Sequence, residues 1–133
     1  MRISDIEGIG PIYARDLSQI GIRTTEALLK KGATPKGRQE IEQASGIGHK
    51  LILEWVNLAD LYRIKGVGSE YSDLLEEAGV DTVVELAKRD ADNLTAKMAQ
   101  INKIANLVNK LPGRKQVSKW IQQAKKLHRV VTY

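Results

Sequence analysis

The chain has 133 residues, of which 42% are hydrophobic, and it carries a formal net charge of +5 at pH 7. This length suits one compact unit or two very small ones, and the composition is ordinary for a globular protein. Because the chain contains no cysteine, disulfides, thiolate metal sites and cysteine nucleophiles are excluded. The first ten residues lack the apolar core of a signal peptide, and no apolar run approaches transmembrane length. We therefore expect a cytoplasmic protein with no membrane partner.

Charge is distributed unevenly along the chain. Residues 97–133 contain nine Lys or Arg and no Asp or Glu, whereas residues 1–96 contain 12 bases and 16 acids. Such an asymmetry predicts a surface for nucleic acid or another polyanion at the C-terminal end. A solvated basic helix that keeps the protein soluble is the alternative interpretation.

The first 45 residues have the pattern of short helices separated by tight turns. Pro11 follows Gly10 directly, and the first turn of a helix tolerates a residue without an N–H. Gly21 has the position of the glycine that follows a helix C-terminus. Helix N-caps are predicted at Thr24 and at Thr34, which precedes Pro35, and Ser4 with Glu7 fits a capping box.

The next corner, Ser45–Lys50, reads SGIGHK and has two glycines around one aliphatic residue, followed by His49 and Lys50. Glycine tolerates positive φ and lets another backbone approach closely. A Gly-x-Gly corner that leads into a helix also leaves several backbone N–H groups without intrahelical partners, and these groups favour an anion. A plain tight corner between two helices is the other interpretation.

The pattern of the first corner returns later in the chain. At a constant offset of 58 residues, Gly8, Gly10, Gly21 and Thr24 align with Gly66, Gly68, Gly79 and Thr82. Each half also has a second corner, since Gly48 precedes Trp55 by seven residues and Gly113 precedes Trp120 by seven. The fourth corner is degenerate, because either Leu111 or Lys115 replaces one of its glycines. The repeat predicts two domains, residues 1–58 and residues 59–133.

The apolar residues of the second half keep a helical spacing. Leu94, Met98, Ile101, Ile104, Ala105 and Val108 recur every three to four residues and predict one amphipathic helix. Only the terminal VVTY has a strand-like pattern. The predicted fold class is therefore all-α. Trp55 and Trp120 have helical spacing relative to leucines and isoleucines, which favours core positions over stacking on bases.

The pattern aliphatic, x, Gly, aliphatic, Gly followed by a helix resembles the helix-hairpin-helix motif. It is clear at residues 6–17, 44–55 and 64–75 and weak at 109–120. Two such motifs joined by a connector helix form the helix-hairpin-helix domain of DNA repair and replication proteins. The chain resembles two such domains in tandem, and is similar to an uncharacterised family of bacterial proteins with the same duplicated layout.

This resemblance implies that hairpin amides, with nearby bases, hold DNA backbone phosphates without reading sequence. The implied contacts are Gly46, Ile47, Gly48, His49 and Lys50 at the second corner; Gly8, Ile9 and Gly10 at the first; Gly66, Val67 and Gly68 at the third; and Gly113, Arg114, Lys115 and Lys119 at the fourth. Two departures weaken the pattern. Pro11 lacks an N–H at the first corner, and Glu70 places a carboxylate at the third.

No catalytic, metal or cofactor site is predicted. His49 and His128 are the only histidines, and neither has a metal-ligand spacing. No Gly-Lys-Ser/Thr sequence follows a glycine cluster, which excludes a Walker-type phosphate loop. We expect a non-enzymatic protein that binds DNA without sequence specificity. The alternative is a protein-interaction or scaffold module that keeps the fold without binding DNA.

Overall fold

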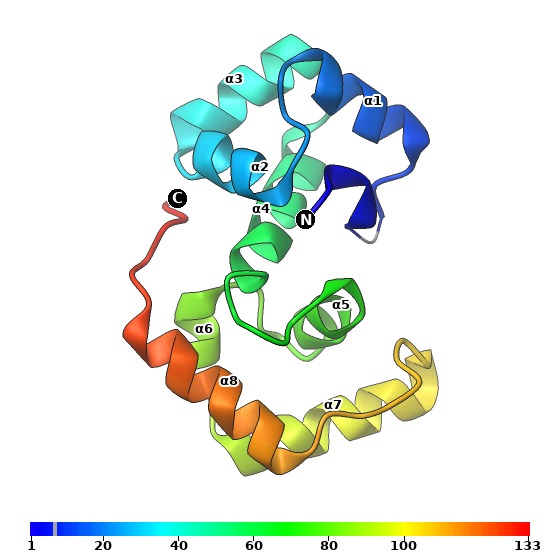
Figure 1. Ribbon diagram of the computed structural model, residues 1–133, viewed down its shortest axis with the longest axis vertical. Helices are drawn as coiled ribbons and strands as arrows, with labels where there is room; N and C mark the ends of the chain where they lie inside the picture. The colour runs from blue at the N-terminus through cyan, green and yellow to red at the C-terminus, as the bar shows by residue number, and fades with distance from the viewer. Residues whose placement is uncertain (7) are drawn as a thin grey trace. The chain divides into compact units, whose positions relative to one another are not determined.

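A computed structural model describes residues 1–6 and 8–133 and is all-α in those residues (Figure 1). The elements are the 3-10 helix η1 (Ile3–Asp5) and the helices α1 (Pro11–Gln19), α2 (Thr25–Gly32), α3 (Pro35–Ser45), α4 (His49–Leu61), α5 (Ser69–Glu77), α6 (Val83–Ala87), α7 (Ala91–Ala105) and α8 (Arg114–Lys126). The only β-type pairing among the described residues is an isolated bridge between Arg2 and Thr24. The predicted all-α class is confirmed. The capping box of Ser4 with Glu7 lies outside the described residues.

The chain divides into two compact units. The first unit comprises Met1–Asp60 together with Val130–Tyr133, and the second unit comprises Leu61–Arg129. These units differ from the predicted domains, 1–58 and 59–133, chiefly in the last four residues, which pack with the first sixty. In the part of the chain that the structure describes, no helix is both long and apolar enough to cross a membrane.

Several helices begin at a residue whose side chain caps the first turn. Thr24 accepts a hydrogen bond from the N–H of Ala27 at 3.1 Å, and Thr34 accepts one from the N–H of Gly37 at 3.1 Å. In the second unit Thr82 and Asp90 cap α6 and α7 in the same way, at 3.3 and 2.9 Å. Each cap satisfies a backbone donor that has no partner within the helix. The helix starts predicted at Thr24 and Thr34 are confirmed.

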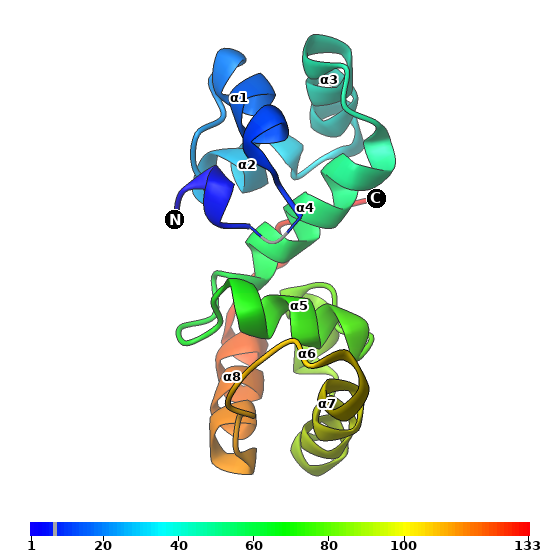
Figure 2. The same ribbon diagram turned by 90° about the vertical axis from the view of Figure 1, so that its right-hand side faces the viewer.

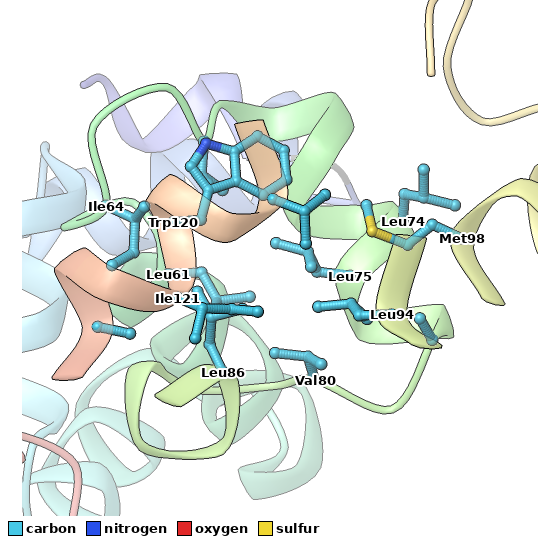
Figure 3. Packing of buried hydrophobic residues seen from close by; sticks show 14 of the residues in the cluster. Leu61, Ile64, Leu74, Leu75, Val80, Leu86, Leu94, Met98, Trp120 and Ile121 are labelled. Carbon is cyan, nitrogen blue, oxygen red and sulfur yellow. The ribbon is translucent and has the colours of Figure 1, made fainter. Parts of the chain in front are cut away.

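The core of the second unit includes Trp120, which is 1% exposed (Figure 3). Helices α6 and α7 pack against α8, and α5 packs against α7. The other residues of this core that Figure 3 labels are Leu61, Ile64, Leu74, Leu75, Val80, Leu86, Leu94, Met98 and Ile121. In Figure 2, α7 and α8 lie side by side and are joined by the long connection 106–113.

The first unit buries Trp55 in the same manner, with 1% of its surface exposed. In each unit the indole meets a tyrosine ring. The ring centroids of Tyr13 and Trp55 are 5.1 Å apart at an interplanar angle of 59°, and those of Tyr71 and Trp120 are 5.3 Å apart at 55°. Tilted pairs at this distance are a favourable arrangement of aromatic quadrupoles. The prediction that both tryptophans are core residues is confirmed.

The amphipathic helix expected to reach Val108 ends at Ala105 instead. Asn106 adopts the left-handed conformation, with φ of 51°, and its N–H donates to the carbonyl of Asn102 at 2.8 Å. Ile104 is 87% exposed, so its expected place on the apolar face is wrong. Val108 is buried, but a loop carries it there, held by two 3.0 Å hydrogen bonds between its backbone and the Asn102 side chain. The strand-like VVTY segment forms no strand.

Candidate nucleic-acid interface

The three Gly–aliphatic–Gly corners each begin with a glycine in the left-handed conformation. The first glycines, Gly8, Gly46 and Gly66, have φ of 87°, 76° and 96°. At Gly46 this left-handed conformation ends α3, and the Gly46 N–H closes the helix on the carbonyl of Glu42 at 2.8 Å. A residue with a Cβ adopts this conformation at a cost, which accounts for glycine at the first position of each corner.

The middle residue of each corner points into the core. Ile9, Ile47 and Val67 are all buried. Their N–H groups are also used internally: Ile47 donates to Ser45 Oγ at 3.1 Å, while Ile9 and Val67 donate to the carbonyls of Ile6 and Ile64 at 3.1 Å. The structure therefore assigns these three residues to folding. Any ligand at the corners meets the second glycine and the residues after it.

The second glycines occupy positions where the fold does not demand glycine. Apart from the two chain neighbours, a Cβ added to Gly10, Gly48, Gly68 or Gly113 would meet no heavy atom of the described residues within 4 Å. The φ angles of Gly10 and Gly113 are both −77°, which any residue adopts. The helices that follow Gly10, Gly68 and Gly113 begin without a side-chain cap, unlike those that follow Thr24, Thr34, Thr82 and Asp90. The missing side chains leave open the approach to these helix N-termini.

At the second corner, the open glycine Gly48 is followed closely by the exposed, positively charged Lys50. Among the described residues, no hydrogen bond engages the N–H of Gly48, His49 or Lys50. Both side chains are exposed, and Lys50 has no ion pair in the described part of the chain. Helix α4 is 13 residues long, so its dipole favours an anion at this end. One carboxylate lies close to this helix N-terminus and is unfavourable for an anion there: Glu42 Oε2 is 3.7 Å from His49 Nδ1.

The first and third corners lack that combination. At the first corner, Ile12 is 66% exposed and Tyr13 37% exposed, so apolar surface surrounds the open glycine. Arg15 lies 3.9 Å from Asp16 in an ion pair. At the third corner the first turn of α5 carries the exposed carboxylate of Glu70. Neither corner gathers cationic side chains.

The structure of the fourth corner differs from both alignments, the one with Leu111 and the one with Lys115 in place of a glycine. The left-handed residue that ends α7 is Asn106, and a six-residue connection, 107–112, separates it from Gly113. Pro112, which lies directly before the glycine as Ile47 does, is buried, and Leu111 is exposed. Asparagine is the residue other than glycine that most readily adopts this conformation, so Asn106 was the available signal in the sequence.

Helix α8 presents a basic face. Lys115, Lys119 and Lys126 are exposed at helical spacing, on the side away from buried Val117 and Trp120. No ion pair of the described residues engages these three lysines. Arg114, in contrast, forms an ion pair with Asp92 of α7. The three lysines span about 16 Å along the helix, enough to meet several phosphates of one strand.

The described residues contain no cluster of three or more His, Asp or Glu side chains that could hold a metal ion. The groups observed at the second and fourth corners are backbone amides at helix N-termini and exposed lysine side chains.

A model of one protein family, described as "Domain of unknown function (DUF4332)", matches residues 7–127. The chain belongs to this DUF4332 family. The match contains the four corners and all of α8, so in this DUF4332 protein both units are part of the family domain. It stops before the last six residues. A search of curated proteins and a search of solved structures each gave no match.

Proposed function

We propose that this protein is a non-enzymatic DNA-binding protein that contacts backbone phosphates without reading sequence. The observation that carries the proposal is the set of open second glycines at the corners. Where neither backbone conformation nor packing requires glycine, the absence of a side chain serves close approach by another molecule. The open groups are N–H donors at helix N-termini, for which phosphate is a suitable ligand.

The second corner and the basic face of α8 are the two surfaces that we assign to DNA. At the second corner, a phosphate oxygen accepts hydrogen bonds from the N–H groups of His49 and Lys50, and the Lys50 ammonium adds charge. On α8, Lys115 and Lys119 follow Gly113 and supply the cations. Phosphate contacts position a protein on DNA but carry no base information, which makes the binding sequence-independent.

We further propose that both units are helix-hairpin-helix domains derived from a duplication. Helices α1 and α5 occupy the same nine positions of the 58-residue repeat, and α4 and α8 are both 13 residues long. The two tyrosine–tryptophan pairs, with almost equal distances and angles, support the same relationship.

A protein-interaction or scaffold role is the second candidate. It is favoured by the exposed Ile12 and Tyr13 at the first corner and by Glu70 at the third, which suit a protein partner better than phosphate. In that case the corners serve only as folding units.

Filling the open glycines tests the proposal. Gly48→Leu and Gly113→Leu each add a side chain at a position where a Cβ meets no neighbour, so we expect both variants to fold and DNA affinity to weaken by about tenfold for each. Gly68→Leu is the matched control, because it makes the same change at an open glycine beside a carboxylate and should leave affinity unchanged. Fluorescence anisotropy with duplex, single-stranded and forked oligonucleotides measures the affinities. Equal affinities for all three variants and the wild type would contradict the proposal.

A further inference from the structure

The first unit has a groove of about 750 Å³ that the corners do not use. Its walls come from the end of α1 and from α2 and α3. The apolar lining consists of Ile20, Ile22, Ala27, Ile41 and Ala44. A volume of this size is typical of sites that bind a ligand or a few side chains of a partner.

The polar lining of the groove is mainly cationic. It includes Lys30, Lys31 and Lys36, against one carboxylate, Glu40. Lys31 is committed to an ion pair with Glu40, and this hydrogen bond and charge, with Lys36 nearby, lower the pKa of that carboxyl. Lys30 and Lys36 have no ion pair in the described part of the chain, and both are exposed. The groove thus keeps two uncommitted positive charges beside an apolar floor.

The second unit covers the corresponding place with its own side chain. Arg89, which aligns with Lys31 at the 58-residue offset, donates to the carbonyls of Gly79 at 2.9 Å and Ala78 at 3.4 Å, directly after α5. In the first unit the residues that align with Ala78 and Gly79 are Ile20 and Gly21, and both line the groove. Lys31 forms an ion pair with Glu40 and, unlike Arg89, donates no hydrogen bond to the equivalent carbonyls among the described residues. The first unit therefore lacks the side chain that, in the second unit, binds the carbonyls after α5.

We propose that this groove binds an acidic amphipathic helix of a protein partner. Apolar side chains at helical spacing would cover Ile20 and Ala27, while Asp or Glu side chains on the flanks of that helix would pair with Lys30 and Lys36. Nucleic acid fits the groove less well, because a phosphate backbone would pair with the lysines and leave the apolar floor uncovered. The inference is independent of DNA binding, since the groove shares no residue with the second corner or α8.

The test uses the full chain labelled with ¹⁵N and a designed peptide of about 15 residues, long enough to form helix on binding. Its apolar face carries Leu at i, i+3, i+4 and i+7, and its polar face carries Glu. The matched control peptide has Lys in place of each Glu. A duplex oligonucleotide forms the third arm. Amide chemical shifts report where each probe binds.

We expect the Glu peptide to shift the amide resonances of Ile22, Ile41 and Ala44, and the Lys peptide to shift none of them. The double variant Lys30→Glu with Lys36→Glu should weaken binding of the Glu peptide at least about tenfold. Lys88→Glu should not weaken it, because Lys88 is the counterpart of Lys30 in the second unit. The proposal is overturned if the Glu peptide leaves these resonances unmoved, if both peptides move them equally, or if only the oligonucleotide moves them. If Lys50 or Lys115 variants lose DNA binding, the proposal for the groove is unaffected, because neither residue lines the groove.

Discussion

At the scale of single residues, glycines outside the left-handed positions differ in what surrounds them. A Cβ added to Gly37 would lie 1.9 Å from the carbonyl oxygen of Lys31, and one added to Gly32 would lie 2.5 Å from Val56 Cγ2. These glycines let helices approach each other closely. At Gly68 and the other second glycines, an added Cβ meets nothing within 4 Å. The sequence alone does not separate the two kinds, because the distinction depends on what lies opposite in three dimensions.

Replacing one glycine of each kind by alanine tests this distinction. Gly37→Ala should lower the free energy of unfolding by about 2 kcal/mol or more, because the backbone must move to relieve the overlap. Gly68→Ala should change it by less than about 1 kcal/mol, since φ of −101° suits alanine and the site is open. Urea unfolding followed by circular dichroism measures both. If both variants lowered the free energy of unfolding equally, the close approach of Gly37 to the Lys31 carbonyl would be contradicted.

At the scale of secondary-structure elements, helix starts were predictable and one helix end was not. Thr24, Thr34 and Pro11 act on their own first turn, so their effect is visible in the local sequence. The end of α7 depends on Asn106, while the apolar spacing continues past it to Val108. Val108 is buried because the Asn102 side chain holds the loop through two hydrogen bonds. The spacing of apolar residues does not predict such a contact.

Substitution of Asn106 measures how strongly this helix end depends on it. Asn106→Gly should leave stability unchanged or slightly improved, because glycine adopts the left-handed conformation without strain. Asn106→Ala should cost about 1 kcal/mol, since alanine does not. Thermal unfolding of the two variants gives the comparison. An alanine variant as stable as the glycine variant would mean that α7 does not end in this conformation.

At the scale of the whole molecule, the recurrence of glycine and threonine positions at an offset of 58 residues was readable from the sequence, but the return of the C-terminal segment to the first unit was not. Val131 is buried in the first unit, and the Thr132 carbonyl accepts from Arg38 at 2.7 Å. Arg38, itself buried, also donates to the carbonyl of Gly32 at 2.8 Å. Arg38 and Thr132 are 94 residues apart along the chain, so local sequence patterns do not predict their contact.

The tail is therefore expected to stabilise the first unit. Val131→Asp should lower the free energy of unfolding by about 2–3 kcal/mol, because a carboxylate replaces a buried side chain. His128→Asp, at an exposed position before the tail, should change it by less than about 0.5 kcal/mol. Chemical unfolding followed by circular dichroism measures the stability of both variants. A tail that contributes nothing would give equal stabilities for the two variants.

If DNA is held through its phosphates, its binding must weaken as the salt concentration rises. Each phosphate neutralised by a lysine releases counterions, so log K falls by about 0.9 per duplex contact for each unit of log salt. With Lys50 and the lysines of α8 as the cations, we predict a slope between about −3 and −5. Lys50→Ala should reduce its magnitude by about one, to a similar extent for unrelated sequences. The absence of duplex and single-strand binding even near about 50 mM salt would contradict the account and favour the protein-interaction role.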